Sequence, residues 1–315
     1  ALCLGYLDPD GFLGGDMHLD RDGAERGLVN SIAEPMNVTI EQAAAGLFDV
    51  LLAKTVGAVR QITVERGRDP RESALLAYGG AGPLLGPLVG REMDLREIIV
   101  PNAPSGFSAW GMLSADVVDD YSRTHIQLLE DMSPHALEAI YQEIEGEAAA
   151  SLQRQGVRPD GASLTRQLEL RYLGQEHALA VQVSSNLDFA ATVQAFEEQH
   201  EARYGHRMEA KVQTLTIRVR AIGSTTKPPL FKLPAKSGDV SRAMVGTRQA
   251  FCFQRRDKTD FAVFTRNKLA PGDRIFGPAL IEEGSSVTVI HTGQRLVVDV
   301  YGHLVVTALS EGPKK

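Results

Sequence analysis

The sequence is poor in the features that mark several protein classes. It has only two cysteines, Cys3 and Cys252, in 315 residues, and they are too few and too far apart for a disulfide framework. We therefore expect a reducing, cytoplasmic setting. No apolar run is expected to reach the roughly 18 to 20 residues of a membrane-spanning helix, and the first residues lack the basic start of a secretory signal.

Signals for nucleic-acid binding are also scarce. The 33 Lys and Arg residues are outnumbered by 40 Asp and Glu residues, and aromatic residues make up 6% of the chain. Proteins that neutralise phosphate backbones cluster Lys and Arg on one surface, whereas no basic run here exceeds two residues. We expect neither nucleic acid nor an anionic membrane as a partner.

What is present is the composition of a globular protein. Hydrophobic residues make up 43% and charged residues 23% of the chain, and the length is enough for two domains of ordinary size. The chain opens on the apolar run "ALCLGY" without an initiator Met. This beginning predicts a fragment, or a chain processed from something larger.

The first 125 residues alternate between helical and strand patterns. Thr39 and Gln42 form a capping-box signature before a long helical pattern that ends near Gly67. "ALLAY" and "EIIVP" are short apolar runs that predict buried strands, and the intervening run that opens at Pro83 predicts a helix. "SGFSAWGMLSADVVDD" is expected to begin another helix. The pattern favours an α/β fold.

The rest of the chain has a different pattern of apolar residues. A helical connector is predicted over 126–160, and alternating apolar residues then predict strands. One predicted strand face joins Leu215 to Ile217, Val219 and Ala221, and one prominent helix begins at Asp188. We therefore expect α/β residues 1–125, the connector, and a β-rich C-terminal domain over 161–315 that folds independently. "TTKPPLFKLPAKSG" is predicted to be a loop or linker.

A glycine cluster joins the first predicted strand to its helix, and its residues are Gly79, Gly80, Ala81, Gly82 and Pro83. Backbone without side chains lets a flat ligand approach, and the following helix offers unpaired N–H groups. The cluster matches neither GxxxxGK[ST] nor GxGxxG, so a phosphate loop is not predicted. A plain strand-to-helix turn with close packing is the alternative reading of the pattern.

Several longer motifs resemble one enzyme family. They are "ERGRDPRESALLAYGGAGPL", "IIVPNAPSGFSAWGMLSADVVDDYSRT", "YLGQEHALAV", "YGHRMEAKVQTLTIRVRAIG" and "PGDRIFGPALIEEGSSVTV". In order and spacing they resemble the second half of the hydantoinase A and oxoprolinase family over about residues 1–309. These are ATP-dependent enzymes, and the family also includes the nucleotide-binding subunits of acetone and acetophenone carboxylases.

The resemblance implies a fold and a site. The fold would be the latter part of an actin-like ATPase core, followed by a C-terminal β domain with one prominent helix. Gly79, Gly80, Ala81, Gly82 and Pro83 would form the adenosine-contacting turn. The family's N-terminal phosphate loops have no counterpart here, and Leu85 and Gly86 replace the His-Ala of many relatives. ATP and Mg²⁺ would be cofactors of the full-length parent, whose catalytic residues would lie largely in the missing half.

The function implied by the resemblance is ATP-dependent opening of a cyclic amide such as a hydantoin or 5-oxoproline, with this chain supplying the adenosine side. The partners implied are the missing N-terminal half, a second subunit of the hydantoinase B type in a hetero-oligomer, and a small-molecule substrate. Two alternatives stay open: a subunit of an ATP-dependent ketone carboxylase, and a non-catalytic assembly module. Little or no ATP hydrolysis is expected from the fragment alone.

Other candidate sites are weaker. His200 and His206 are six residues apart and miss the i, i+4 spacing of two helical metal ligands, so no metal site is predicted. Asp8, Asp10, Asp16 and Asp20 lack the order of an EF-hand, which favours a turn-rich loop. Gly14, Gly15 and Asp16 could approach substrate or nucleotide in the family. Ser105, Ser108 and Ser114 lack a nucleophile elbow, so a loop packed beneath the glycine turn is expected.

Overall fold

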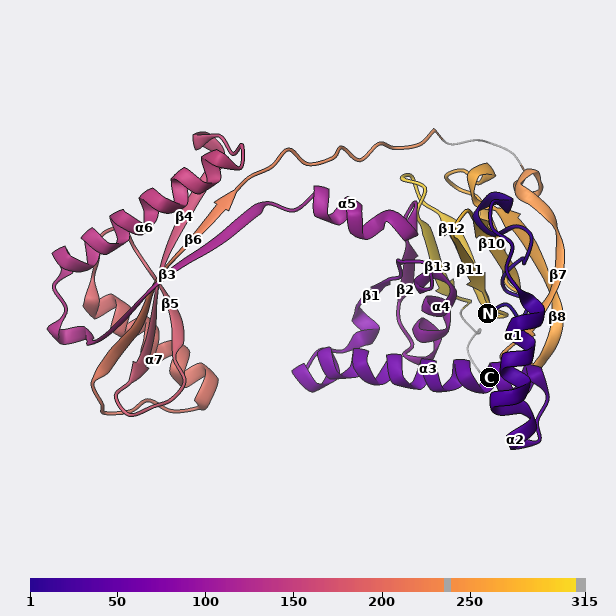
Figure 1. Ribbon diagram of the computed structural model, residues 1–315, viewed down its shortest axis with the longest axis horizontal. Helices are drawn as coiled ribbons and strands as arrows, with labels where there is room; N and C mark the ends of the chain where they lie inside the picture. The colour runs from indigo at the N-terminus through magenta and orange to yellow at the C-terminus, as the bar shows by residue number, and fades with distance from the viewer. Residues whose placement is uncertain (235–238, 310–315) are drawn as a thin grey trace, which may run out of the picture. The chain divides into compact units, whose positions relative to one another are not determined.

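The computed structural model describes residues 1–234 and 239–309, which form two compact units. The first unit joins residues 1–112 to the chain from residue 229 onward, and the second unit is the intervening segment 113–228. Figure 1 shows indigo and yellow segments, from the two ends of the chain, together in the first unit. The second unit is thus an insertion in the sequence of the first.

The longest helix of the first unit, α3 (Ile40–Ile62), begins as the sequence predicts. The Thr39 hydroxyl accepts the Gln42 N–H, and the Gln42 side chain accepts the Thr39 N–H, so both donors are satisfied at the helix start. The other α-helices from this part of the sequence are α1 (Arg21–Leu28), α2 (Glu34–Met36), α4 (Gly82–Glu92) and α5 (Phe107–Leu113).

Two sheets complete the first unit. One has the order β1 (Ala74–Leu76), β2 (Glu97–Val100), β13 (Leu304–Ala308), β12 (Gln294–Val298) and β9 (Arg274–Phe276). The other has the order β11 (Ser286–Ile290), β10 (Ala279–Glu283), β8 (Asp257–Thr265) and β7 (Met244–Cys252). β1 and β2 are parallel and joined through α4, whereas β13 pairs antiparallel with β2. Within the described residues β1 is an outer strand, and Leu76 is exposed.

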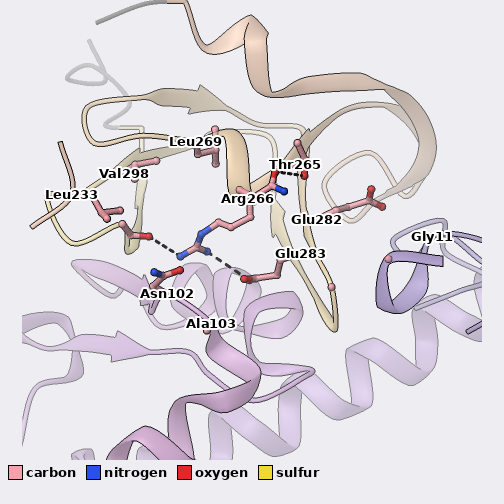
Figure 2. Close-up of a pocket in the computed structure, with 14 residues that line it drawn as sticks. Gly11, Asn102, Ala103, Leu233, Thr265, Arg266, Leu269, Glu282, Glu283 and Val298 are labelled. Atoms are coloured by element: carbon pink, nitrogen blue, oxygen red, sulfur yellow. Dashed lines mark hydrogen bonds and ion pairs between the residues drawn. The ribbon is translucent and has the colours of Figure 1, made fainter. Parts of the chain in front are cut away.

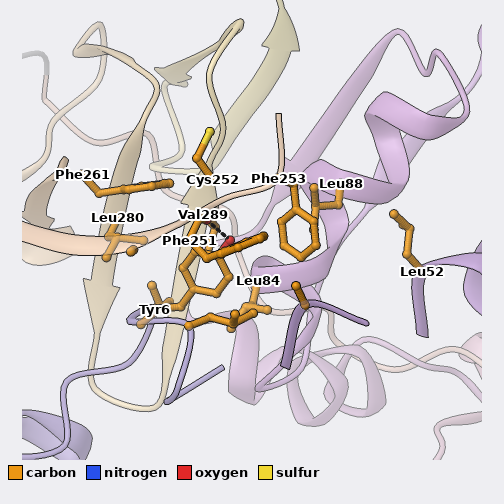
Figure 3. Close-up of a cluster of buried hydrophobic side chains, with 14 of the residues drawn as sticks. Tyr6, Leu52, Leu84, Leu88, Phe251, Cys252, Phe253, Phe261, Leu280 and Val289 are labelled. Atoms are coloured by element: carbon orange, nitrogen blue, oxygen red, sulfur yellow. Dashed lines mark hydrogen bonds between the residues drawn. The ribbon is translucent and has the colours of Figure 1, made fainter. Parts of the chain in front are cut away.

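The core of the first unit brings distant segments together. Figure 3 shows Tyr6 and Phe261 beside Phe251, near Leu84 and Leu88 of α4. The Tyr6 hydroxyl donates a hydrogen bond to the Phe251 carbonyl, and burial of these large apolar side chains stabilises the unit. Because the N-terminal segment, α4 and the C-terminal strands share one core, neither end of the chain forms this unit alone.

The second unit is one sheet with two helices. Its strand order is β3 (Val117–Leu128), β6 (Val212–Gly223), β4 (Ala162–Tyr172) and β5 (Leu179–Val183), and all pairs are antiparallel. α6 (Pro134–Arg154) and α7 (Phe189–Tyr204) supply Tyr141, Ile144 and Phe196 to its core. The Asp188 side chain caps α7 by accepting the Ala191 N–H, as predicted.

Two sequence predictions need correction here. The helix that begins at Phe107 ends at Leu113, and the following residues "VVDD" begin β3, which pairs with β6 along most of its length. Leu215 does not share the buried face of Ile217, because the pairing with β4 passes from Thr216 to Thr214 and leaves Leu215 as the extra residue. Such a bulge moves a side chain to the other face of a strand.

The division into units differs from the expected 1–125, 126–160 and 161–315. A boundary at 161 would separate β4, β5 and β6 from β3 and α6, with which they share a sheet and a core. It would also separate β13 from β2. Residues 225–234 of the predicted linker are described and form neither helix nor strand, while 235–238 lie outside the described residues.

One helix is longer and more apolar than the sequence analysis expects. Residues 40–66, which comprise α3 and the turn after it, are long and apolar enough to cross a membrane by length and composition alone. Leu47, Val50 and Leu51 are exposed on this helix. A single helix of this kind is weak evidence for a membrane, because core helices of other proteins pass the same test.

Candidate functional site

The glycine cluster forms the turn between β1 and α4. Gly79 has φ +85°, a left-handed conformation that favours glycine, and its N–H donates to the Pro104 carbonyl at 2.8 Å. Gly80 and Ala81 are exposed. A Cβ on Gly79 would meet no heavy atom within 4 Å, and one on Gly80 would meet only the Ser285 carbonyl oxygen at 3.8 Å. The turn therefore presents open backbone to a ligand.

The five predicted residues do not have equal roles in this turn. Gly82 and Pro83 are the first residues of α4, and Pro83 is buried. A Cβ on Gly82 would lie 3.4 Å from the carbonyl carbon of Ala77, so Gly82 also serves close packing. Ala81 is the N-cap and offers no side-chain acceptor to the helix N–H groups. Gly79 and Gly80 are therefore the open positions of the turn, whereas Gly82 and Pro83 also pack against the fold.

Two other segments lie next to the turn. In the loop after β2, the Pro104 carbonyl accepts the Gly79 N–H, as expected for a loop packed against the turn. In the β10–β11 hairpin, the Ser285 carbonyl oxygen lies next to Gly80. The Ser285 hydroxyl donates to the Ser105 hydroxyl at 2.8 Å, which ties the hairpin to the loop. The adjacent Gly284 accepts the Leu13 N–H at 2.7 Å. The N-terminal loop thus contacts the same β10–β11 hairpin.

A cavity of about 630 Å³ lies beside this hairpin. Most of its lining comes from the N-terminal loop, the loop after β2, the helical turn after β8 and the end of β10. The lining includes Gly11, Gly14, Asn102, Ala103, Thr265, Arg266, Asn267, Leu269, Glu282, Glu283 and Gly284, together with Leu233, Val298 and Gly302. Gly14 is among the residues expected near substrate or nucleotide, whereas Gly15 and Asp16 do not line the cavity.

Arg266 and Glu283 are the charged pair that sequence reasoning missed. The Arg266 side chain is 7% exposed, and its Nη2 donates to the carbonyl oxygens of Pro101 and Gly302 at 3.1 and 2.8 Å. Its Nη1 lies 3.7 Å from Glu283 Oε1 and has no hydrogen bond within the described residues. Figure 2 shows the guanidinium between Asn102 and Glu283. The parallel pairing of Thr265 with Glu282 brings the two side chains together.

Electrostatics distinguish Glu283 from its neighbour Glu282. Burial raises the pKa of Glu283, while the Arg266 charge and a hydrogen bond from the Ser286 hydroxyl act in the opposite direction. Burial also lowers the pKa of Arg266, against the attraction of Glu283 and Asp299. Glu282 instead accepts a hydrogen bond from Arg248 at 2.7 Å. The cavity therefore contains a carboxyl group whose pKa is raised by desolvation, and one nearby cation opposes this rise.

The weaker candidates have local roles. Asp20 caps α1, Asp8 pairs with Arg248, and Asp10 contacts His18, which agrees with a turn-rich loop. His200 is buried, and its Nδ1 hydrogen-bonds the His206 carbonyl rather than sharing a ligand with that imidazole. Cys3 and Cys252 are both buried and unpaired with each other.

Comparison with known proteins identifies the family. Residues 1–121 match the family described as hydantoinase/oxoprolinase, and residues 129–307 match the hydantoinase/oxoprolinase C-terminal domain. The chain is 28% identical to the caprolactamase subunit alpha of Pseudomonas jessenii, covering 95% of this chain and 44% of the relative. It is 26% identical to the acetone carboxylase beta subunit of Xanthobacter autotrophicus, covering 96% and 44%.

Solved structures agree with this assignment. A nucleotide-free acetone carboxylase structure, studied for ATP-dependent acetone carboxylation, superposes with a TM-score of 0.82 at 25% identity and covers 98% of this chain and 45% of that one. The crystal structure of ATP-dependent caprolactamase from Pseudomonas jessenii gives 0.75 at 27% identity, with 98% and 46% covered. The chain spans less than half the length of these relatives. It belongs to the hydantoinase/oxoprolinase family.

Proposed function

We propose that this chain is part of an ATP-dependent enzyme that opens a cyclic amide, and that it supplies the adenosine side of the nucleotide site. The observation that carries the proposal is the open backbone at Gly79 and Gly80, at the end of a parallel strand and the start of a helix. Ligands of open α/β sheets bind at this end of parallel strands. The names of the relatives, caprolactamase and 5-oxoprolinase, support the substrate class.

The residues present fit an adenosine. The turn leaves the volume above Gly79 and Gly80 free, where any side chain would intrude, and backbone N–H and C=O groups there can contact a ribose or a purine edge. ATP would supply a phosphoryl group that turns the poorly reactive amide oxygen into a leaving group. The proposal includes an actin-like core, with the phosphate contacts and Mg²⁺ held by a segment that resembles the N-terminal half of the relatives.

A ketone carboxylase subunit is the second candidate. The TM-score of 0.82 to an acetone carboxylase favours it. Both candidates use the same nucleotide turn and differ in the acceptor of the phosphoryl group. In either case we propose a second subunit as partner, because the caprolactamase and carboxylase relatives are named as subunits.

The deciding experiment uses the complete protein that contains this chain, purified with its partner subunit. ADP release is measured with hydantoin, 5-oxoproline or ε-caprolactam, and separately with acetone and bicarbonate. Release that depends on a cyclic amide supports the first function, and release that depends on acetone supports the second. Failure of Mg²⁺-ATP to bind the complete protein in calorimetry would refute both.

A further inference from the structure

The cavity beside the hairpin has an unused acceptor at its edge. Ser286 and Arg266 both contact Glu283 through Oε1. Within residues 1–234 and 239–309, no donor contacts Oε2 of this side chain, which lines the cavity. Arg266 is anchored by two carbonyl groups and its Nη1 lies 3.7 Å from Glu283 Oε1, so it restrains the position of the carboxyl group. Glu283 is therefore held in place with one oxygen free for a ligand.

The cavity also contains a side-chain amide. The Asn102 side chain lines the same cavity, and its amide makes no hydrogen bond to the described part of the chain, although its backbone N–H donates to His303. Figure 2 shows Asn102 and Glu283 on either side of the Arg266 guanidinium. A side-chain amide can donate to a carbonyl oxygen, and a carboxylate can accept an N–H group. Together they complement a ligand that presents both groups on one edge.

We infer that this cavity binds the amide edge of a lactam or related cyclic amide, with Glu283 accepting the ring N–H, Asn102 donating to the ring carbonyl and Arg266 positioning Glu283. A ring amide is held cis, so its N–H and C=O lie side by side on one edge. The inference rests on the proposed function, whose substrate class it places at named residues. The volume of about 630 Å³ accommodates a small ring with room for substituents.

Charge in the cavity favours the closed ring over its product. The charged residues of the lining are Arg266, Glu282 and Glu283, so its formal charge is negative. Arg248, which pairs with Glu282, also pairs with Asp8 and does not line the cavity. Ring opening creates a new carboxylate, which would lie next to Glu283 and be repelled by it. The cavity is also separate from the residues proposed for adenosine, because none of Gly79 to Pro83 lines it. We therefore assign the purine to the turn and the amide to the cavity.

The test compares two ligands on the 315-residue chain by ligand-observed NMR titration. ε-Caprolactam has the N–H that Glu283 would accept, and N-methylcaprolactam lacks it. We expect ε-caprolactam to bind at least ten-fold more tightly, because a hydrogen bond to a charged acceptor is worth about one decade in affinity. Equal affinities would overturn the inference. This comparison needs no variant.

Matched variants then locate the site. Glu283→Gln should lower ε-caprolactam affinity about ten-fold, while Glu147→Gln, at a half-exposed glutamate of α6 that does not line the cavity, should leave it unchanged. Adenosine affinity should be the same in both variants. If Glu283→Gln instead weakens adenosine, or if adenosine competes with ε-caprolactam, the cavity is a purine site and the inference is wrong. Thermal unfolding of each variant shows that it is folded.

The outcomes separate this inference from the proposed function. If the complete protein releases ADP in response to a cyclic amide but Glu283→Gln leaves the KM for that amide unchanged, the function stands and the cavity assignment fails. If lactam binding depends on Glu283 but no nucleotide binds, the assignment stands and the proposed function fails. We expect Glu283→Gln to raise the KM for the amide about ten-fold and to leave the KM for ATP unchanged.

Discussion

Gly80 is the residue through which the nucleotide proposal can be tested most cleanly. A Cβ there would lie 3.8 Å from the Ser285 carbonyl oxygen, so Gly80→Val fits the fold but projects into the volume proposed for adenosine. In the complete protein we expect Mg²⁺-ATP affinity to fall ten- to hundred-fold, or about 1.4 to 2.8 kcal/mol, measured by calorimetry. Gly82→Val is a poorer probe, because Gly82 begins α4 and its Cβ would already contact the Ala77 backbone at 3.4 Å.

Gly146→Val, in α6 of the second unit, is the matched control for that change. A Cβ there would meet nothing within 4 Å, and the position is far in sequence from the turn. It should leave ATP affinity unchanged. If Gly80→Val folds normally and binds ATP as tightly as the parent, the cluster is only a strand-to-helix turn, as the alternative reading of the sequence holds.

Gly86 has a packing role rather than a binding role. Its Cβ would lie 2.6 Å from the Ala77 Cβ, so α4 can lie close to β1 only if this residue is glycine. We expect Gly86→Ala to lower the free energy of unfolding by about 1 to 3 kcal/mol, the range for overpacked cores. Gly57→Ala in α3, where a Cβ meets nothing within 4 Å, should be neutral or stabilising. Urea denaturation of both variants measures the difference, and equal stabilities would contradict this packing account.

His291 links stability to pH. Burial lowers its pKa to about 3, the Arg91 charge acts in the same direction, and neither ring nitrogen has a hydrogen-bond partner within the described residues. The unfolded chain binds a proton near pH 6.5, whereas the folded chain does not. Stability should therefore fall as the pH drops from 6.5 toward 3, by up to about 1.4 kcal/mol per pH unit from this group.

The variant His291→Phe isolates that contribution. The ring sits edge-on to Tyr6 and Phe253, at centroid distances of 6.4 and 6.2 Å, so an aromatic replacement is the closest in shape. Urea denaturation at pH 7, 6 and 5 should show a shallower loss of stability in the variant. Parallel pH curves for parent and variant would show that His291 is not the titrating group.

At the scale of elements, one ion-pair cluster holds α6 to the second sheet. Arg166 of β4 is 8% exposed at its side chain and contacts Glu138 and Glu145 of α6, both at 2.6 Å. Removing the cation leaves two partly buried carboxylates without a partner. We therefore expect Arg166→Met to lower the free energy of unfolding by about 1 to 3 kcal/mol. Arg123 of β3 forms a half-exposed ion pair with Glu147 of α6. Arg123→Met should lower the free energy of unfolding by less than about 1 kcal/mol.

Acid should weaken the same cluster. Hydrogen bonds from Arg166 lower the pKa of Glu138, so the unfolded chain takes up this proton at a higher pH than the folded chain. The stabilisation is present above the ordinary glutamate pKa and disappears as the pH falls through the folded value. Chemical denaturation of Arg166→Met and Arg123→Met at pH 7 and pH 4 checks both points. A cost for Arg166→Met that equals that of Arg123→Met at pH 7 would contradict the cluster's role.

Local signals predicted most elements correctly. The Thr39 and Gln42 capping box gave the start of α3, Asp188 gave the start of α7, and the glycine cluster fell between a strand and a helix. These features depend on neighbouring residues in the sequence. The bulge at Leu215 and the strand after Leu113 could not be predicted in this way, because both depend on pairing with strands distant in sequence. Leu215 is the extra residue opposite β4, where Glu169 pairs with Thr216, and the strand after Leu113 pairs with β6, where Val117 meets Gly223.

The cavity was missed for the same reason. Arg266 and Glu283 follow ordinary strand patterns and are 17 positions apart, and only the parallel register between β8 and β10 makes them neighbours. The one local signal was a charged residue directly after each apolar run, "FAVFTR" and "ALIEE". Such residues are common at strand ends, so the sequence alone gave no reason to choose these two.

For the whole molecule, the strongest expectation concerns the second unit. Its first strand enters at Val117 and its last strand leaves at Gly223, and these two residues are paired across β3 and β6. The segment 113–228 therefore has adjacent ends and its own core, and it should fold when expressed alone. Circular dichroism should show cooperative thermal unfolding, and a non-cooperative melt would contradict it. The segment 161–315 should not unfold cooperatively, because it lacks β3, α6, β1 and β2.

The outer position of β1 has a consequence for handling the protein. Among residues 1–234 and 239–309, β1 pairs only with β2. An unpaired strand edge presents peptide groups that can recruit another chain, and exposed Leu76 adds an apolar contact beside it. The strand itself, "ALL", carries neither a lysine nor a proline to discourage such pairing. We therefore expect turbidity and slow precipitation at high concentration when the chain is purified alone, and we expect a companion strand along β1 to remove them.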